Sequence, residues 1–358
     1  MAWLGRILEG NFSVSNRGPR GTASNMRGNY LIGFAAGIVT AVVFLSATTG
    51  SVPMRVLLFL LTPLPLFLAG FGWGWGTTVI AAIAGTLATA VLTTVQVATI
   101  FAISPAIPSI ILTYLVTLNR PATGPGPDVD PNTRLEWYPV GRIVVWAAAI
   151  SGVMALIAMV LIGPDLDTLR QEVKKLVETV FKAQFESING GKALSDADLE
   201  RLVDVGMYIL PAATALSWML TVLLNLWLAG RIALASGRLP RPWPDIPSMR
   251  FPRFTPLILA VASLATFIPG YVALGASAFS GAFYFAYVLM GLAVIHYITR
   301  GQPWRSFALW ALYVVLLVLS TGISVLIALL GLVEGIVSIR GRAKSLPPPP
   351  RPPPDNSS

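Results

Sequence analysis

The sequence predicts an all-α protein, a polytopic transmembrane helical bundle, and three observations support that class. Only 11% of the 358 residues are charged, less than half of the roughly 25% that is usual in soluble domains. One apolar run after another reaches the roughly 20 residues that a helix needs to cross a bilayer. The runs are apolar on every side, whereas the strands of a membrane β-barrel alternate apolar and polar residues.

About nine such runs follow one another, which corresponds to 8–10 passes. They are Tyr30–Ala47, Val52–Phe71, Thr77–Val95, Val97–Leu118, Ile143–Gly163, Tyr208–Leu234, Pro256–Gly275, Ala278–Ile298 and Ser306–Ile339. The last run holds 34 residues, about 50 Å of helix against a bilayer core of about 30 Å. A break at Ser320-Thr321-Gly322 would turn it into a short hairpin, and a single long tilted helix is the alternative.

The chain divides into a basic leader, a transmembrane domain and a proline-rich tail. Residues 1–29 are polar and rich in Gly, Ser and Asn, so we expect a disordered leader, in which Met26 is an alternative start. Residues 30–339 form the transmembrane domain. Residues 340–358 contain LPPPPRPPPDNSS and are expected to be a disordered, extended tail, because consecutive prolines adopt polyproline II.

Residues 164–207 form a sizeable amphipathic helical insertion outside the membrane. Apolar residues between Leu166 and Ile188 recur at three- and four-residue steps, which predicts an amphipathic helix. Ser195 followed by Asp198 is a capping-box pattern that opens a second helix toward the next span. We expect a helical hairpin that lies on the outer membrane surface, and a lid over an outward-facing cavity is the alternative.

Charge predicts the orientation, because basic residues collect on the cytoplasmic side of inner-membrane proteins. The outer insertion is net acidic, with nine acidic against six basic residues. With a cytoplasmic N-terminus, the cytoplasmic connections are Gly72–Gly76, Asn119–Arg142, Ala235–Thr255 and Thr299–Arg305. A hairpin in the last run would return the C-terminus to the cytoplasm. We therefore predict a multi-pass protein of the bacterial inner membrane.

The sequence identifies no catalytic, cofactor or metal site. The chain has no cysteine and one histidine, His296, so thiolate chemistry and multi-histidine metal sites are excluded. It has no Walker-type loop, and spans one to eight hold no carboxylate of the kind that ion-coupled carriers use. The net charge of +9 is explained by cytoplasmic loops. We expect no enzyme activity, no cofactor and no nucleic-acid partner.

Four residues are candidates for a small-molecule site. Arg55 and Gln96 are expected at the outer ends of the second and third runs, where they could share a vestibule. Trp218 and Asn225 lie deeper in the sixth run. Polar groups in spans are costly and often functional, but each could equally bond a neighbouring helix. In the last run, Glu334 could pair with a basic group near the interface.

Small residues at four-residue spacing predict close helix packing. Gly33, Gly37 and Ala41 share one face of the first helix, which either packs inside the bundle or receives a partner membrane subunit. In the segment FLAGFGWGWGTT we expect a tight cytoplasmic turn. Trp73 and Trp75 are interpreted there as interfacial anchors, since an indole suits the headgroup layer.

Several segments together resemble the YybS-like family of predicted bacterial membrane proteins. They are LLTPLPLFLAGFGWGWGTTVIAAIAG, AISPAIPSIILTYL, HYITRGQPWRSFALWALYVVLL and LIALLGLVEGIVSIRGR. The resemblance covers roughly residues 28–343. That family is distantly similar to the S-components of energy-coupling-factor transporters, which bind a small molecule and dock on a coupling subunit through small residues of the first helix. The chain departs from them in having about three more runs and a large outer segment.

The resemblance and the lack of catalytic groups lead to one expected function and two alternatives. We expect a non-enzymatic, small-molecule-binding component of transport type, with the lipid bilayer, a small-molecule ligand and a membrane subunit as partners. The first alternative is a structural or assembly factor of the cell envelope or division machinery, because the outer hairpin and the proline-rich tail offer surfaces to partners. A membrane enzyme is the second.

Overall fold

The computed structural model of the protein describes residues 13–14, 23–124, 126, 129–130, 134–188, 195–318 and 320–340. The chain forms two compact units, residues 1–245 with 250–286 and residues 246–249 with 287–358, and each is described by itself. Helices make up most of the described chain, which confirms the predicted all-α membrane class.

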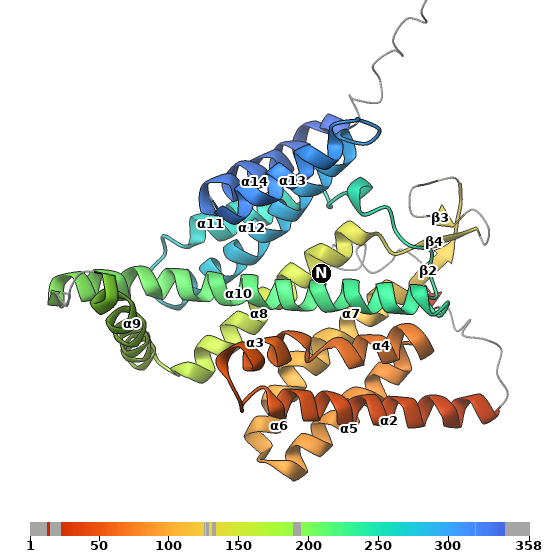
Figure 1. The fold of residues 1–358 in the computed structure, drawn as a ribbon, viewed down its shortest axis with the longest axis horizontal. Coiled ribbons are helices and arrows are strands. Elements are labelled where there is room, and N and C mark those ends of the chain that lie inside the picture. The colour runs from red at the N-terminus through yellow and green to blue at the C-terminus, as the bar shows by residue number, and fades with distance from the viewer. Residues whose placement is uncertain are drawn as a thin grey trace, which may run out of the picture. The chain divides into compact units, whose positions relative to one another are not determined.

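The first unit is a helical bundle with one small sheet (Figure 1). Its helices are α2 (Ala23–Ser46), α3 (Val52–Leu61), α4 (Leu64–Trp73), α5 (Trp75–Leu92), α6 (Val95–Phe101), a π-turn (Ala102–Ala106), α7 (Ile107–Thr117), α8 (Val140–Ile162), α9 (Leu166–Ile188), α10 (Asp196–Ala235), α11 (Thr255–Ala265) and the first part of α12 (Tyr271–Ile298). Its strands are β1 (Ser13–Val14), β2 (Leu118–Pro121), β3 (Val129–Asp130) and β4 (Leu135–Trp137).

Seven described helices are long and apolar enough to cross a membrane. The span Val52–Trp73 consists of α3 and α4, and the span Val95–Thr117 consists of α6, the π-turn and α7. Large apolar side chains face outward, such as Val91 of α5, which is 85% exposed. Such outward apolar surface is expected where helices contact lipid. The helices α11, α13 and α14 are apolar but shorter.

The predicted apolar run Pro256–Gly275 has the wrong bounds. It contains a turn, since α11 ends at Ala265 and α12 begins at Tyr271. Gly270 in this turn has a φ of +83°, a backbone conformation that favours glycine. The dipeptide Pro269-Gly270 is a turn signal, but the apolar residues on both sides led the prediction to join the two helices into one run.

The turn of FLAGFGWGWGTT lies where α4 meets α5, as the sequence predicts. Only Gly74 separates the two helices, and its φ of +98° is a value that glycine adopts readily. Gly70 serves close packing instead, because a Cβ there would collide with Thr78 and Thr113. Gly76 has open space around it.

A four-stranded antiparallel sheet in the order β1-β2-β4-β3 was not predicted. Three of its strands lie in or next to the connection 119–142, and the fourth lies in the leader that we expected to be disordered. The helix α2 likewise begins at Ala23, seven residues before the apolar run that starts at Tyr30. The other leader residues and positions 341–358 lie outside the described residues.

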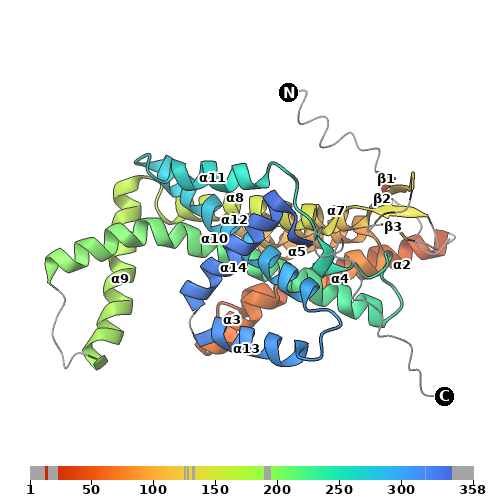
Figure 2. The same ribbon diagram turned by 90° about the horizontal axis from the view of Figure 1, so that it is seen from above.

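The predicted outer hairpin consists of α9 and the start of α10. The side-chain oxygen of Ser195 accepts the backbone N–H of Asp198 at 3.2 Å, which confirms the predicted helix cap. The helix α10 has 40 residues, about 60 Å at the usual rise, so its first turns extend beyond a bilayer core of about 30 Å. Figures 1 and 2 show α9 lying crosswise to α10.

The second unit contains the last part of α12 together with α13 (Arg305–Val318) and α14 (Ser320–Val337). The helix α13 ends at Val318 and α14 begins at Ser320, so the last predicted run holds two helices. Position 319 lies outside the described residues, and the predicted break at Ser320-Thr321-Gly322 falls on the first residues of α14. Helices α12 and α14 pack closely, because a Cβ at Gly291 would collide with Ile327 and one at Gly331 with Tyr287.

Candidate functional site

Two membrane spans of the first unit have irregular helical backbone near their middle. The span Val52–Trp73 breaks at Thr62-Pro63, between α3 and α4. The span Val95–Thr117 contains the π-turn Ala102–Ala106, with Pro105 inside it. Proline has no N–H to donate, so the usual helical bond to the carbonyl four residues earlier is missing. At the first break the Phe59 carbonyl accepts the N–H of Thr62 instead, at 3.3 Å. Within a membrane such irregular backbone is tolerated where it is buried in protein or lines a polar cavity.

Asn225 of α10 lies against the first break and is fully buried. Its Nδ2 donates to the carbonyl oxygen of Leu60 at 2.6 Å and to that of Thr221 at 2.7 Å. Both N–H groups of the amide are therefore used. Its Oδ1 is buried and has no hydrogen-bond partner within the described structure. Asn225 thus supports the broken helix and leaves one strong acceptor unpaired.

Two hydroxyl groups follow the second break. Ser109 and Thr113 lie one turn apart on α7, and both are buried with side-chain oxygens that lack a partner among the residues described. The neighbouring hydroxyl of Thr78 donates to the carbonyl oxygen of Leu66 at 3.3 Å. Because Gly70 has no Cβ, α4 can lie close to α5, which carries Thr78, and to α7, which carries Thr113. These two hydroxyls were not predicted. The prolines of AISPAIPS indicate irregular backbone within the span, and such backbone is often accompanied by polar side chains.

The four candidate ligand residues do not form one cluster in the part of the chain that is described. Trp218 packs edge-on against Phe59 of α3, with ring centroids 6.2 Å apart, and so shares the α3–α10 contact with Asn225. Arg55 is exposed on α3, and Gln96 is exposed near the start of α6. No contact between described residues joins Arg55 or Gln96 to the other two.

The small-residue face of α2 packs against α5. A Cβ at Gly37 would lie 2.8 Å from the backbone nitrogen of Gly85 and 2.9 Å from the Cβ of Ala84. A Cβ at Gly33 would likewise lie 3.1 Å from the Cβ of Ile80. Ala41 on the same face is fully buried. This face is therefore covered within the chain, and a partner subunit could reach it only by displacing α5.

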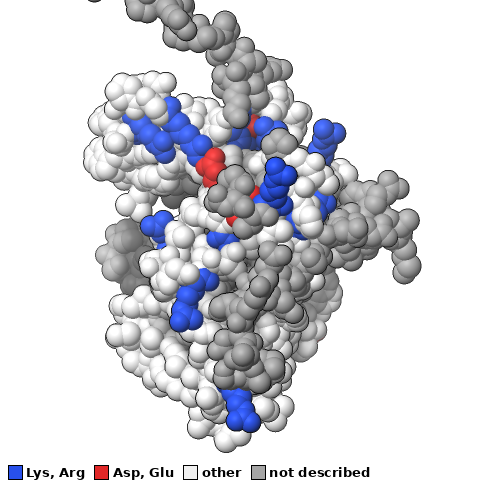
Figure 3. All heavy atoms as spheres, turned by 90° about the vertical axis from the view of Figure 1, so that its right-hand side faces the viewer, with Lys and Arg blue, Asp and Glu red and all other residues white. Residues whose placement is uncertain are grey.

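The two tryptophans of the α4–α5 turn have different neighbours. Trp73 lies under the guanidinium of Arg238, whose Cζ is 4.5 Å from the ring centroid. Trp75 packs edge-on against Tyr114, with centroids 5.5 Å apart. The turn thus meets the chain that follows α10, at an end of the bundle where Lys and Arg predominate over Asp and Glu (Figure 3).

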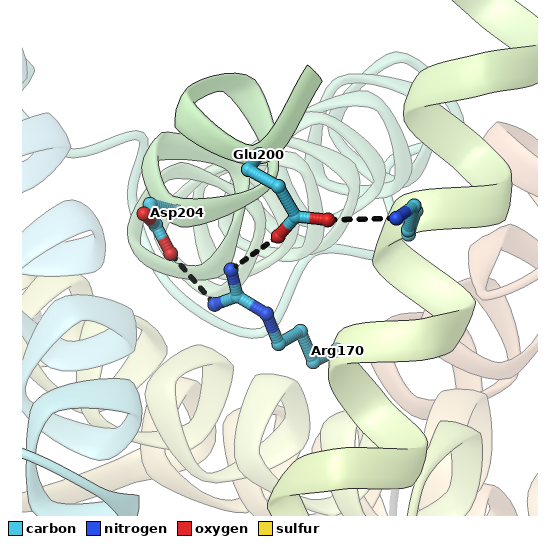
Figure 4. Close-up of polar contacts among 4 residues, drawn as sticks. Arg170, Glu200 and Asp204 are labelled. Atoms are coloured by element: carbon cyan, nitrogen blue, oxygen red, sulfur yellow. Dashed lines mark hydrogen bonds and ion pairs between the residues drawn. The ribbon is translucent and has the colours of Figure 1, made fainter. Parts of the chain in front are cut away.

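Ion pairs connect α9 and α10 at the hairpin. Arg170 donates to Glu200 at 2.8 Å and to Asp204 at 2.6 Å, as Figure 4 shows. Lys174 donates to the other oxygen of Glu200 at 2.7 Å. Hydrogen bonds to these carboxylates raise the pKa of Arg170 and of Lys174. Because all these side chains are 40% exposed or more, solvent screening keeps their contribution to stability small.

A hydrophobic cluster fixes the same hairpin to the spans. Leu169 and Val173 of α9 are buried against Val203 of α10, Met159 of α8 and Leu274 of α12. The base of the hairpin thus packs against the spans α8 and α12. Further along α9, Leu176 and Val180 are 47% and 46% exposed.

In the second unit, Glu334 pairs with Arg340. The Arg340 Nε donates to the Glu334 carboxylate at 2.9 Å, and both side chains are almost fully buried. Arg340 also donates to the carbonyl oxygens of Pro247 at 2.6 Å and Met249 at 2.8 Å. A satisfied buried pair of this kind fixes one segment against another. Arg340, which we assigned to the disordered tail, is part of this packed structure.

The described residues contain no group of three or more His, Cys, Asp or Glu side chains placed to hold a metal ion.

Comparison with known proteins gives one family match. A family model described as a predicted membrane protein (DUF2232) matches residues 38–334. No curated protein and no solved structure matches the chain significantly. The predicted resemblance to membrane proteins is confirmed at this level, and the likeness to YybS-like proteins and to S-components stays a prediction.

Proposed function

The chain belongs to the DUF2232 family of predicted membrane proteins, and from this premise we propose that it is a non-enzymatic component of transport type that binds a small molecule within the membrane. The proposed location is the bacterial inner membrane, with a cytoplasmic N-terminus. The observation that carries the proposal is the broken span at α3–α4, with the buried Asn225 beside it.

Broken helices at mid-membrane are a common basis of substrate sites in transporters. Where a span is interrupted, free backbone groups and nearby polar side chains can bind a ligand in an otherwise apolar region. Here the break lies near the middle of Val52–Trp73, and the unpaired Oδ1 of Asn225 lies next to it. A buried acceptor without a partner costs about 1–3 kcal/mol. A ligand that donates a hydrogen bond to this oxygen would recover that energy.

The ligand class follows from the groups around Asn225. The oxygen is an acceptor, so the ligand must supply a hydroxyl, amide or amine N–H. Phe59 and Trp218 next to it are aromatic, which suits a ligand with an apolar body. We assign the site to an uncharged or amphipathic organic molecule. Energy for transport would come from a separate membrane partner, as the predicted likeness to S-components implies.

The proposal is tested by native mass spectrometry of the full chain purified in mild detergent. The wild type should retain a small organic molecule, and Asn225→Leu should lose it, because this variant removes the acceptor. Thr62→Val is the matched control. It removes a hydroxyl at the same break, but that hydroxyl bonds only the Leu58 carbonyl of its own helix, at 2.8 Å. The control should keep the molecule.

Two results would count against the proposal. One is a wild-type protein that carries no small molecule and shows no thermal shift across a panel of vitamins and related metabolites. The other is a molecule that Asn225→Leu retains as well as the wild type does. Subunits that co-purify with the chain, identified in the same preparation, would name the membrane partner.

A second candidate function is that of an assembly factor, and the hairpin α9–α10 favours it. A hairpin held by the cluster around Leu169 is a fixed platform that exposes Leu176 and Val180 to a partner. A photo-crosslinking amino acid at Val180 should then capture a specific envelope protein. The same amino acid at Val91, which faces outward from a span, is the control. Identical captured proteins at both positions would remove the basis for this candidate.

A further inference from the structure

Two arginines at the end of α10 stack on tryptophan rings. The Cζ of Arg231 lies 5.2 Å from the ring centroid of Trp243, and the Cζ of Arg238 lies 4.5 Å from that of Trp73. Both pairs lie where α4 meets the end of α10, because a Cβ at Gly230 would lie 3.3 Å from Trp243 and 3.8 Å from Phe71, and one at Gly72 would lie 3.8 Å from Arg238. Phe71, in turn, is two residues before Trp73.

The edges of these two guanidinium groups are available to a ligand. Stacking occupies the flat face of a guanidinium and leaves its N–H donors at the rim. Arg231 and Arg238 are both exposed. Among the residues that the structure describes, no carboxylate lies within ion-pair distance of either one.

Other arginines at this end of the bundle are already engaged. Arg120 pairs with Glu136 at 2.7 Å. Arg241 is only 6% exposed and donates to the carbonyl oxygen of Tyr138 at 3.2 Å. Arg241 also lies over a tryptophan ring, that of Trp137, but it is buried. Arg231 and Arg238 differ from these neighbours because they combine stacking on tryptophan with exposure to solvent.

The ends of apolar spans place this site where lipid headgroups are expected. Trp73 is the last residue of α4, and α10 ends four residues after Arg231, so both pairs sit where apolar spans reach the membrane surface. Tryptophan prefers this layer, and arginines near helix ends extend toward it. The anion that is most concentrated at that depth is the phosphate of a phospholipid.

We propose that Arg231 and Arg238, each held by its tryptophan, bind the phosphate of an anionic phospholipid. The planar guanidinium matches two phosphate oxygens at once. The net negative headgroup is preferred over a zwitterionic one, because phosphatidylcholine carries its own cation beside the phosphate. The site is independent of the small-molecule site at Asn225, since it uses different residues at the surface end of α10.

The test measures lipid retention by the full chain, reconstituted from vesicles of phosphatidylcholine with one-fifth phosphatidylglycerol. Native mass spectrometry should show phosphatidylglycerol enriched over phosphatidylcholine relative to the vesicle. The double variant Arg231→Gln/Arg238→Gln should lose most of this enrichment, since each lost guanidinium removes a bidentate contact with the phosphate. Arg250→Gln/Arg253→Gln is the matched control, because it removes two exposed arginines that do not stack on tryptophan.

A lysine variant and a competition with inorganic phosphate show which feature of the site binds the lipid. Arg231→Lys/Arg238→Lys keeps the charge and loses the planar fork, so it should fall between wild type and the glutamine variant. Equal enrichment in the glutamine variant and in the matched control would overturn the proposal, as would a wild type without preference. If inorganic phosphate displaces the lipid completely at millimolar concentration, free phosphate is the ligand and the lipid assignment is wrong.

Discussion

Glycine has different roles at neighbouring positions of FLAGFGWGWGTT. Gly74 has a φ of +98° and a ψ of 156°, a region that is nearly restricted to glycine. Gly70 has an ordinary helical backbone, and what matters there is the space that Thr78 and Thr113 would take from a side chain. Gly76 meets neither condition, since nothing lies within 4 Å of its Cβ position. The repeated glycines therefore do not form a single functional motif.

This difference predicts that Gly74→Ala is much more harmful than Gly76→Ala. The alanine at 74 would be strained by its backbone angles, which costs about 1–3 kcal/mol. At 76 the effect should stay within about 0.5 kcal/mol, as for other open surface positions. The free energy of unfolding by SDS titration in mixed micelles measures both. Equal losses would show that the turn adapts to a side chain.

Residue-scale packing on α2 gives a second prediction. Gly37→Ala should lower the free energy of unfolding by about 1–3 kcal/mol, because overpacked interfaces force backbones apart. The added Cβ would lie 2.8 Å from the backbone nitrogen of Gly85. Gly28→Ala is the control on the same helix, where nothing lies within 4 Å, and it should be neutral or slightly stabilising. A harmless Gly37→Ala would mean that α2 and α5 are not closely packed in the bilayer.

How far the sequence predicts single residues depends on where their partners lie in the chain. The cap at Ser195 was predictable because its partner, Asp198, is three residues away. The bond from Asn225 to the Leu60 carbonyl joins residues 165 positions apart, and nothing local to Asn225 indicates it. The candidate vestibule of Arg55 and Gln96 depended on such a distant contact, and the described structure does not join these two residues to Trp218 or Asn225.

At the scale of elements, the hairpin α9–α10 is held by two kinds of interaction of unequal strength. The ion pairs of Arg170 and Lys174 are exposed, and such pairs contribute about 0–1 kcal/mol each. The buried side chain of Leu169, 1% exposed, belongs to a cluster with three other helices. Truncating a side chain of this kind typically costs about 2–5 kcal/mol. Apolar burial is thus the main reason why α9 stays attached.

Leu169→Ala should therefore release α9, while Arg170→Gln should not. Hydrogen exchange of the backbone amides in α9 measures the local opening. A loss of about 2 kcal/mol corresponds to exchange that is faster by about 30-fold, and this is the smallest acceleration expected for Leu169→Ala. Arg170→Gln removes two exposed ion pairs, and at about 0.5 kcal/mol for each pair we expect about fivefold faster exchange. The effect should be smaller at high salt, because salt screens exposed charges. The reverse order of the two variants would show that the ion pairs dominate.

Elements were predictable where composition changes at their ends. The span α8 lies between Pro139 and Gly163, and α5 lies between Gly74 and the polar pair Thr93-Thr94. Their predicted ranges differ from the observed helices by three residues or fewer. The break between α11 and α12 lies inside a continuous apolar run, so the prediction joined α11 to the start of α12. The strands β2 and β4 were missed because, with four and three residues, they are too short to show alternation.

At the scale of the whole molecule, charge is distributed unequally between the connections. The connection 235–255 that follows α10 contains four arginines and one acidic residue, whereas 164–207 contains nine acidic and six basic residues. The rule that basic residues stay in the cytoplasm then places the α4–α5 turn and the end of α10 inside and the α9–α10 hairpin outside. This orientation is a prediction, and the chain offers a direct way to test it because it contains no cysteine.

Single cysteines report the side of the membrane without any background from native thiols. Lys175→Cys places a thiol on α9, where the lysine side chain is 69% exposed, and Ser236→Cys places one at the exposed end of α10. In intact spheroplasts, a membrane-impermeant maleimide should label position 175 and spare position 236 until the membrane is permeabilised. Both residues are polar and lie at exposed positions, so their intrinsic reactivity is comparable and access decides the result. Labelling of position 236 alone would reverse the orientation. It would then put the two stacked arginines in contact with the outer leaflet, where the charge rule does not expect them.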